Sequence, residues 1–424
     1  MILLFRRCVY ESFNRLARQK LIHWFRQGLY PFPIRFPVVP ASDGAGEVAE
    51  VGEKVSEFKK GDKVTTLFNQ GHQYGDMTPQ AASTGLGGVI DGALRQYGVF
   101  NENGLVKSPS NLNALEASSL PCAALTSWNA LFGLKPLKPG QTVLVQGTGG
   151  VSMFALQVCI DRNPSIRVEP PVNIYIFQFA KAVGARVIAT TSSPEKAEKL
   201  KKLGADHVIN YKTDPNWGET ARKLTPNNVG VDHIVEVGGS GTLKQSLKCI
   251  KFEGVVSIIG FLGGGNPKEQ PVALDALMHI CTIRGVYVGS KALMNDMVDA
   301  IEANDIHPVL DEKVFSLEQA REAYDYMVSV TPSIVGGSIS NTGIDGSKAF
   351  RKASYQGRLV NELDMSRGNE QVNEVNRYEY IPIPLICCTV QFYGVCSIYF
   401  LPQAETLLTK YGLDGHMTHQ EKSL

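Results

Sequence analysis

Apolar residues recur in short runs through the middle of the chain, with helical patterns between them. After the run at 143–145, further strands are predicted at 186–190, 207–209, 231–237, 254–259 and 282–288. Helical patterns separate the strands, notably at 194–203 and 242–249. Strands that alternate with helices at this spacing predict an α/β fold with a doubly wound parallel sheet.

A glycine-rich turn follows the first of these strands. The sequence 142–152, TVLVQGTGGVS, runs from the strand into Gly147, Gly149 and Gly150 and then into a predicted helix. Glycines allow a tight turn whose backbone N–H groups can approach a pyrophosphate at the positive end of the helix. Ser152 stands where the G-x-G-x-x-G pattern has its last glycine. Because strands and helices alternate behind it, the turn predicts a dinucleotide-binding, Rossmann-type domain.

The region before this domain has a different pattern. From about residue 30 to residue 106, glycine and proline turns separate short apolar segments, among them 44–52 (GAGEVAEVG) and 58–64 (FKKGDKV), which indicates an all-β region. The polar stretch 69–88 is predicted to be a loop, and helices are predicted at 114–124 and 127–134.

Residues 158–178 interrupt the helix that follows the glycine turn. Pro164, Pro170 and Pro171 cannot continue a helix. Without these 21 residues the apolar positions fall at spacings of three and four, and Gly184 follows as a C-cap; the positions are Val151, Phe154, Ala155, Phe179 and Val183. We interpret 158–178 as an insertion. Since it begins with Val (codons starting GT) and ends with Gln (one codon is CAG), we hypothesise a translated intron, which a spliced transcript that still encodes it would contradict.

The two ends of the chain differ from its middle. Residues 1–29 are basic and are predicted to be an atypical head, either solvated or a mitochondrial-type leader. Residues 328–424 have little pattern and are predicted to be a largely disordered tail. Within the tail, 380–404 carries no charge and could span a bilayer, but its prolines and glutamines make a membrane span the less favoured interpretation.

Composition narrows the class of protein only slightly. The 424 residues are 43% hydrophobic with a net charge of +1, which is ordinary for a globular protein and indicates no nucleic-acid partner. The eight cysteines include no C-x-x-C pair, so neither a disulfide framework nor a zinc knuckle is predicted. A reducing compartment, the cytoplasm, is expected, with the mitochondrion as the alternative if the head is a leader.

Three segments together resemble the medium-chain dehydrogenase/reductase superfamily, which includes alcohol dehydrogenases and quinone oxidoreductases. They are PVVPASDGAGEVAEVGEKVSEFKKGDKV (37–64), LPCAALTSWNALFGLKPLKPGQTVLVQGTGGVS (120–152) and VIATTSSPEKAEKLKKLGADHVINYK (187–212). The resemblance implies a GroES-like substrate domain at 30–112, a Rossmann domain at 113–300 and a return to the substrate domain at 301–327. It also implies strands before residue 30 and after the last helix for which this sequence shows no counterpart, so an incomplete GroES-like domain with unpaired sheet edges is expected.

The resemblance also allows the zinc ligands of family members to be compared with the residues of this chain. Zinc-binding members have a His–Glu pair where this chain has Ser42 and Asp43, and of their cysteines only Cys122 has a counterpart. Because a catalytic zinc needs three protein ligands, no metal site is predicted; Cys122 is interpreted as a packed thiol and His72 as a loop or pocket histidine. Zinc-free relatives reduce enones, quinones or enoyl thioesters, with hydride delivered to the β-carbon. No catalytic residue is assigned, although Tyr74 is one candidate proton donor.

The end of the second strand, ATTSS at 189–193, favours NADPH over NAD. An NAD site has an acid here for the ribose hydroxyls, whereas this chain offers Thr191, Ser192 and Ser193, with Lys196 for charge. Tyr211 follows Lys196 as it does in NADPH-dependent quinone oxidoreductases, by resemblance. The remaining predicted cofactor residues are Gly147, Thr148, Gly149, Gly150 and Val151 at the pyrophosphate and, by the same resemblance, Thr126, Val237, Gly238, Gly239, Gly260 and Phe261 at the nicotinamide.

The predicted function is therefore zinc-independent, NADPH-dependent reduction of a small molecule with an activated double bond or carbonyl. Two alternatives stay open, a zinc-type alcohol dehydrogenase and a catalytically dead chain that carries retained intron sequence. A homodimer through the edge strand near 282–288 is expected only by analogy with relatives.

Overall fold

The computed structural model describes residues 3–10, 35, 37–156, 179–260, 271–308, 310–311, 313–329 and 338–340. All of these residues fall in one of the two compact units into which the chain divides, and the second unit lies outside the described residues. The predicted tail, apart from 328–329 and 338–340, and the candidate span 380–404 also lie outside them. Among the helices that are described, none has the length and apolar character needed to cross a bilayer.

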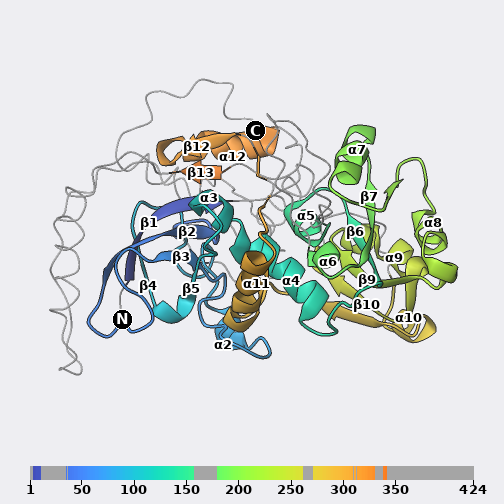
Figure 1. Cartoon of the computed structure of the whole chain (residues 1–424), viewed down its shortest axis with the longest axis horizontal. Helices are drawn as coiled ribbons and strands as arrows, with labels where there is room; N and C mark the ends of the chain where they lie inside the picture. Colours follow the sequence, from blue (N-terminus) through green and yellow to red (C-terminus); the bar gives the residue numbers. More distant parts are fainter. Residues whose placement is uncertain are drawn as a thin grey trace, which may run out of the picture. The chain divides into compact units, whose positions relative to one another are not determined.

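A six-stranded parallel sheet forms the core of the green and yellow half of Figure 1, as the alternating pattern predicts. Its strand order is β11-β10-β9-β6-β7-β8. The strands are β6 (Thr142–Gln146), β7 (Arg186–Thr191), β8 (His207–Asn210), β9 (Val231–Glu236), β10 (Ile250–Ile258) and β11 (Thr282–Gly285). β10 begins earlier than predicted, and its register against β9 shifts between Ile250 and Val255. β11 is an edge strand, and the predicted dimer contact there stays a prediction.

Helices accompany the strands of this sheet. They are α5 (Gly150–Leu156), α6 (Phe179–Ala182), α7 (Pro194–Lys202), α8 (Trp217–Lys223), α9 (Leu243–Cys249) and α10 (Leu274–Met278), with 3-10 turns η3 (Pro226–Asn228) and η4 (Gly239–Gly241). α7 begins where its sequence predicts, because the Ser193 hydroxyl accepts the Lys196 N–H and Pro194 occupies the first turn.

The flanks of the interrupted helix pack as their spacing predicts. Val151, Phe154 and Phe179 are all buried in the main hydrophobic cluster. The Phe179 ring meets the Trp128 ring edge-on, with 5.0 Å between the centroids. Gly184 has φ +76° just after α6, as a C-cap glycine does. The interpretation of 158–178 as an insertion itself lies outside the described residues.

A seven-stranded sheet forms the β-rich half. Its path is β12-β13-β1-β2-β3-β5, and β4 also pairs with β1. The strands are β1 (Leu3–Tyr10), β2 (Gly44–Val51), β3 (Lys63–Thr66), β4 (Gly98–Phe100), β5 (Leu105–Lys107), β12 (Val314–Ser316) and β13 (Ser338–Ser340).

Two of these strands come from segments that were not expected to supply any. β1 lies in the head and pairs antiparallel with β2, β4 and β13, and β13 follows the last helix and pairs in parallel with β12. The expectation that strands are missing at both places is therefore not met. Strand pairing uses backbone N–H and C=O groups, so a segment without family-like side chains can still add a strand to an open edge.

The remaining helices belong to the β-rich half or join the two sheets. They are α2 (Pro79–Ala82), α3 (Ala114–Ala117), the π-helical turn η2 (Leu120–Ala124), α4 (Leu125–Phe132), α11 (Lys291–Ala303) and α12 (Ala320–Ser329), with 3-10 turns η1 (Glu102–Gly104) and η6 (Leu317–Gln319). The single helix predicted at 114–124 is divided, because Pro121 in the first turn of η2 lacks the N–H that a continuous helix needs. The predicted loop 69–88 contains α2.

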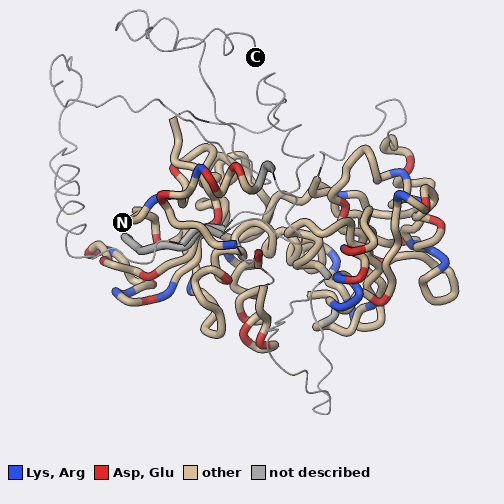
Figure 2. The backbone as a smooth tube through the Cα atoms, turned by 90° about the horizontal axis from the view of Figure 1, so that it is seen from above, with Lys and Arg blue, Asp and Glu red and all other residues tan. Residues whose placement is uncertain are grey.

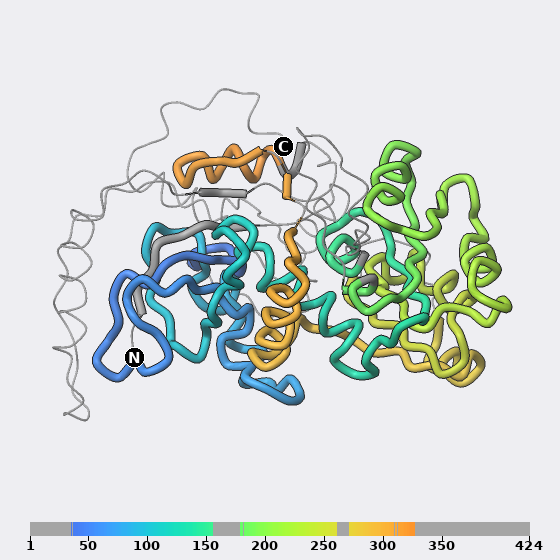
Figure 3. The backbone as a smooth tube through the Cα atoms, viewed as in Figure 1, coloured from blue at the N-terminus to red at the C-terminus, as the bar shows by residue number. Residues whose placement is uncertain are grey.

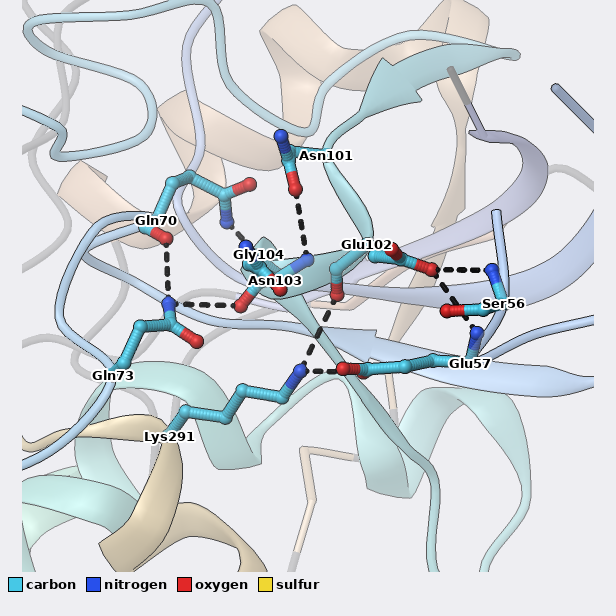
Figure 4. A network of polar contacts seen from close by, with 9 residues as sticks. All are labelled: Ser56, Glu57, Gln70, Gln73, Asn101, Glu102, Asn103, Gly104 and Lys291. Carbon is cyan, nitrogen blue, oxygen red and sulfur yellow. Dashed lines mark hydrogen bonds and ion pairs between the residues drawn. The ribbon is translucent and has the colours of Figure 1, made fainter. Parts of the chain in front are cut away.

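The start of α11, orange in Figure 3, contacts loops of the β-rich half. The Lys291 N–H donates to His72 O and the Ala292 N–H to Gln73 O, each at 2.9 Å. The Lys291 ammonium donates to the Glu57 carboxylate at 2.7 Å and to the Glu102 carbonyl at 3.4 Å (Figure 4). These contacts fasten the chain that leaves β11 to the β-rich half.

Lys, Arg, Asp and Glu are interspersed along the described backbone (Figure 2), as the small net charge would lead one to expect.

Candidate cofactor and reaction site

The turn between β6 and α5 has unoccupied space beside two of its glycines. Gly147 has φ +74°, and its N–H donates to Thr190 O at 2.7 Å, which ties the turn to β7. A Cβ added at Gly147 or Gly149 would meet no atom within 4 Å. This space fits the close approach of a pyrophosphate to the backbone that a dinucleotide site needs.

Ser152 replaces the last glycine of the motif without disturbing the turn. The residue is buried, and its hydroxyl donates to Gln146 O at 2.6 Å. The hydroxyl therefore finds a partner on the last residue of β6, as a buried polar group must. The departure from the glycine pattern adds a hydrogen bond between α5 and the strand before it.

Glu236, at the carboxyl end of β9, was not predicted from the sequence, yet it organises this edge of the sheet. It is fully buried, and its carboxylate accepts the N–H groups of Gly238 and Gly239, each at 2.9 Å. Thr242 also donates to it, as do Ser246 at 2.6 Å and the Gln146 amide at 2.8 Å. Through Gln146 it reaches the glycine turn, and through the two glycines it shapes the predicted nicotinamide turn.

The backbone of Glu236 holds the next loop as well. Its carbonyl accepts the Ile259 N–H at 2.9 Å and the Gly260 N–H at 3.2 Å. A Cβ on Gly260 would lie 1.8 Å from Val237 O, so only glycine fits. The predicted residues Val237, Gly238 and Gly260 thus share one hydrogen-bonded frame, while Phe261 lies outside the described residues. A Val-Glu pair ending a strand is the only sequence signal that could have indicated this frame.

The carboxyl ends of β7 and β8 bring together the residues predicted to select the cofactor. Thr191 is buried, and its carbonyl accepts the Tyr211 N–H at 3.0 Å. Ser193 caps α7, and Lys196 follows in the first turn of that helix. Desolvation, with Lys199 nearby, lowers the pKa of Lys196. A half-buried ammonium that is repelled by a second lysine would gain from an anionic ligand.

The positions that hold zinc in relatives contain a different set of groups. Ser42 and Asp43 are buried, and the Ser42 hydroxyl donates to the Asp43 carboxylate at 3.0 Å. Desolvation and the proximity of Asp43 hold the pKa of the Cys122 thiol well above its usual value, although a hydrogen bond with Thr126 opposes them. A catalytic zinc needs three protein ligands, and among these three residues only Asp43 and Cys122 carry a carboxylate or thiol that could serve as one. Across the described residues, no three His, Cys, Asp or Glu side chains are grouped so that they could hold a metal ion.

Two side chains singled out by sequence have ordinary surroundings. His72 is buried, and its Nε2 is 3.0 Å from Gly75 O, which agrees with a loop histidine. The Tyr74 ring is 80% exposed, so this residue makes a poor candidate for a proton donor in a desolvated site. Tyr287, which the sequence did not single out, is close enough to Cys122 for the two side chains to interact electrostatically. Desolvation and Cys122 both raise the pKa of its hydroxyl.

Comparisons with known proteins agree with this architecture. The family model "Alcohol dehydrogenase GroES-like domain" matches residues 19–110, and "Zinc-binding dehydrogenase" matches 171–303. The zinc-type alcohol dehydrogenase-like protein C1773.06c of Schizosaccharomyces pombe is 47% identical over 307 residues, which is 72% of this chain and 82% of that protein. The quinone oxidoreductase-like protein 2 homolog of Nematostella vectensis is 30% identical over 66% of this chain and 64% of its own length.

Among solved structures, a putative alcohol dehydrogenase from Sinorhizobium meliloti 1021 has a TM-score of 0.66 at 35% identity, covering 80% of this chain and 90% of that one. The two sheets and the open glycine turn define an NAD(P)-dependent oxidoreductase with a GroES-like domain. With relatives this similar over most of its length, the chain belongs to the medium-chain dehydrogenase/reductase superfamily. The roles of the individual cofactor residues stay predictions.

Proposed function

We propose that this oxidoreductase works without zinc and uses NADPH to reduce an activated double bond or carbonyl, of enone, quinone or enoyl type. The single observation that carries the proposal is the group at the zinc position of relatives. There the Ser42 hydroxyl donates to Asp43, and Cys122 is kept as a neutral thiol. Without a metal to polarise it, a plain carbonyl is hard to reduce, whereas an enone accepts hydride at its β-carbon with only hydrogen bonds to its oxygen.

The preference for NADPH is supported by the ends of β7 and β8. No carboxylate occupies Thr191–Ser193, where an NAD site has its acid. Lys196 lies in the first turn of α7, and among the described residues no carboxylate forms an ion pair with it, which supports a role in binding the additional phosphate. When bound, the cofactor supplies the hydride; the protein's residues hold it and exclude water.

The choice of cofactor is tested with Lys196→Ala in the full chain. We expect the Kd for NADPH to rise about 10- to 100-fold, as for one lost hydrogen bond to a charged group, while the Kd for NADH stays within about threefold. Lys202→Ala, an exposed lysine of the same helix, is the matched control. Equal losses for both cofactors would contradict the role of Lys196, and tight NADH binding by the parent would contradict the preference for NADPH.

Measurements on the same purified proteins also test the two alternative functions, a zinc-type alcohol dehydrogenase and a catalytically dead chain. The name of the Schizosaccharomyces pombe relative supports a zinc-type alcohol dehydrogenase, and stoichiometric zinc in the purified chain would favour it. NADPH binding only after deletion of 158–178 would favour the interpretation that this chain is catalytically dead while its uninterrupted form is an enzyme.

A further inference from the structure

The strand order of the six-stranded sheet reverses between β6 and β9. After β6 the chain adds β7 and β8 on one side, and then β9, β10 and β11 on the other. β6 and β9 are parallel neighbours, with Val145 opposite Val235, so their carboxyl ends lie at the same edge. A dinucleotide binds across such an edge with one half on each side of the reversal. We therefore expect the turn after β6 to hold the pyrophosphate and the turn after β9 to hold the nicotinamide half.

Gln146, the last residue of β6, is hydrogen-bonded to both sides of this reversal. The residue is buried, and its carbonyl accepts the Ser152 hydroxyl of α5 at 2.6 Å. Its side-chain Oε1 accepts the N–H groups of Val237 and Gly238, each at 3.2 Å. One residue thus connects the helix that follows the glycine turn with the turn that follows β9.

The orientation of the Gln146 amide is fixed by its partners. Its Nε2 donates to the Glu236 carboxylate at 2.8 Å and to the Ser246 hydroxyl at 2.9 Å. Backbone N–H groups can only donate and a carboxylate can only accept, so the amide fits these surroundings one way round. A shift of the amide would leave buried donors without acceptors, which is costly. Gln146 is therefore a rigid connection between the two turns.

We propose that Gln146 is a positioning residue, which holds the turn after β9 at a set distance from the glycine turn and thereby sets where the nicotinamide ring lies. The proposal rests on the nicotinamide cofactor of the proposed function, but on neither its preference for NADPH nor its substrate. Glu236 shapes the turn after β9 from its own strand, whereas Gln146 reaches that turn from β6. Because hydride transfer needs the ring at a defined place, a turn that is free to shift would weaken both binding and turnover.

The test compares a whole cofactor with the same cofactor lacking its ring, in the full chain and in Gln146→Met. Methionine has a similar length but no amide. Calorimetry gives the Kd for NADPH and for 2′-phospho-ADP-ribose, which is NADPH without nicotinamide. We expect the Kd for NADPH to rise about tenfold and the Kd for the fragment to stay within about twofold, because the carbonyl that accepts Ser152 is retained. NADH and ADP-ribose are compared in the same way.

Thr225→Val is the matched control for a buried polar side chain lost elsewhere. The Thr225 hydroxyl is buried and accepts the Gly230 N–H at 2.9 Å, at the amino end of β9 and so away from the edge that carries the turns. This variant should lower the melting temperature while both Kd values stay within about twofold of the parent. A merely structural role of Gln146 would give the same result as this control.

A milder variant, Ser246→Ala, keeps the test decisive if Gln146→Met does not fold. It removes one of the two acceptors of the Gln146 amide, and we expect the Kd for NADPH to rise about fivefold with the fragment unchanged. Equal losses for NADPH and the fragment, or no loss for either, overturn the role of Gln146. A parent that binds NADH more tightly overturns the preference for NADPH, and the comparison of NADH with ADP-ribose then decides on Gln146. A parent that binds neither cofactor overturns both proposals.

Discussion

Two buried glutamates, one in each half of the molecule, hold loops in place by different means. Glu236 is fully buried and Glu102 is 6% exposed, and each accepts two backbone N–H groups. The other partners of Glu236 are the side chains of Gln146, at the end of β6, and of Thr242 and Ser246, at the N-cap of α9 and within it. Near Glu102 lies instead the Lys291 ammonium, which comes from the other half of the chain and also reaches the Glu57 carboxylate (Figure 4).

The different partners of Glu236 and Glu102 indicate two structural roles for a buried carboxylate. Burial of a charged group is costly unless hydrogen bonds compensate it, so both glutamates force neighbouring N–H groups to converge on them. At Glu236 the convergence shapes the turns at the carboxyl edge of the six-stranded sheet, where the cofactor is predicted. At Glu102 it shapes the loop 56–57 and places Glu57 to receive α11. One glutamate organises a site, and the other joins two segments that lie far apart in sequence.

The largest effect is expected for Glu236→Leu. Loss of the carboxylate leaves the Gly238 and Gly239 N–H groups and the Gln146 amide without their acceptor, and each unsatisfied buried donor costs about 1–3 kcal/mol. We expect the free energy of unfolding to fall by about 3–5 kcal/mol, as measured by denaturant titration. In the milder Glu236→Gln variant the Kd for NADPH should rise at least about tenfold, because the nicotinamide turn loses part of its frame.

Glu219→Gln is the matched control, since this glutamate is exposed and is paired only with Lys248 at the surface. If Glu236→Gln loses stability but binds NADPH as the parent does, the frame around Glu236 is structural and has no role in the site.

The fold of the half that contains the six-stranded sheet could be predicted from the sequence, because its strands, helices and turns are signalled by residues that are close together in the chain. Each strand of the six-stranded sheet contains apolar residues and is followed along the chain by a helix. Gly147 and Gly149 mark the turn because backbone conformation and close approach demand glycine there. Ser193 and Pro194 likewise mark the start of α7. These signals need only neighbours in sequence, so they can be recognised without a structure.

The rest depends on contacts between distant residues. β1 and β13 pair through their backbones with strands that are distant in sequence. Glu236 acquires significance only because Thr242, Ser246 and Gln146 converge on it. No spacing rule along the chain indicates these groupings.

The stabilising contributions of His233 and Glu102, one in each half of the molecule, should be lost over different pH ranges. His233, in the middle of β9, is buried, and within the described structure neither of its ring nitrogens has a hydrogen-bond partner. Desolvation lowers its pKa from 6.5 to about 4. Between these values the unfolded chain binds a proton that the folded chain does not, so stability falls as pH falls, by about 3 kcal/mol in total. Denaturant titrations of the parent and of His233→Leu from pH 7 to pH 4 measure this slope.

The slope should be smaller in His233→Leu, because leucine cannot take up the proton. An identical slope in parent and variant would show that other groups cause the loss of stability. The contribution of Glu102 should persist through the same range. Hydrogen bonds from the Glu57 and Ser56 N–H groups, together with Lys291, lower its pKa, and a carboxylate with a lowered pKa gives up its stabilisation only as pH falls through that lowered value.

The smallest effect is expected for Glu102→Gln. An amide can still accept one N–H but presents its own N–H₂ to the other, so we expect a loss of about 1–2 kcal/mol at pH 7. The loss should shrink only as pH falls through the pKa of Glu102, which is lowered from the ordinary value of 4.5, because the parent's own carboxylate is then protonated. Glu57→Gln, which removes a half-exposed ion pair with Lys291, should cost less than about 1 kcal/mol. Neither variant should change the Kd for NADPH by more than about threefold, and a larger change would mean that Glu102 shapes the cofactor site as Glu236 does.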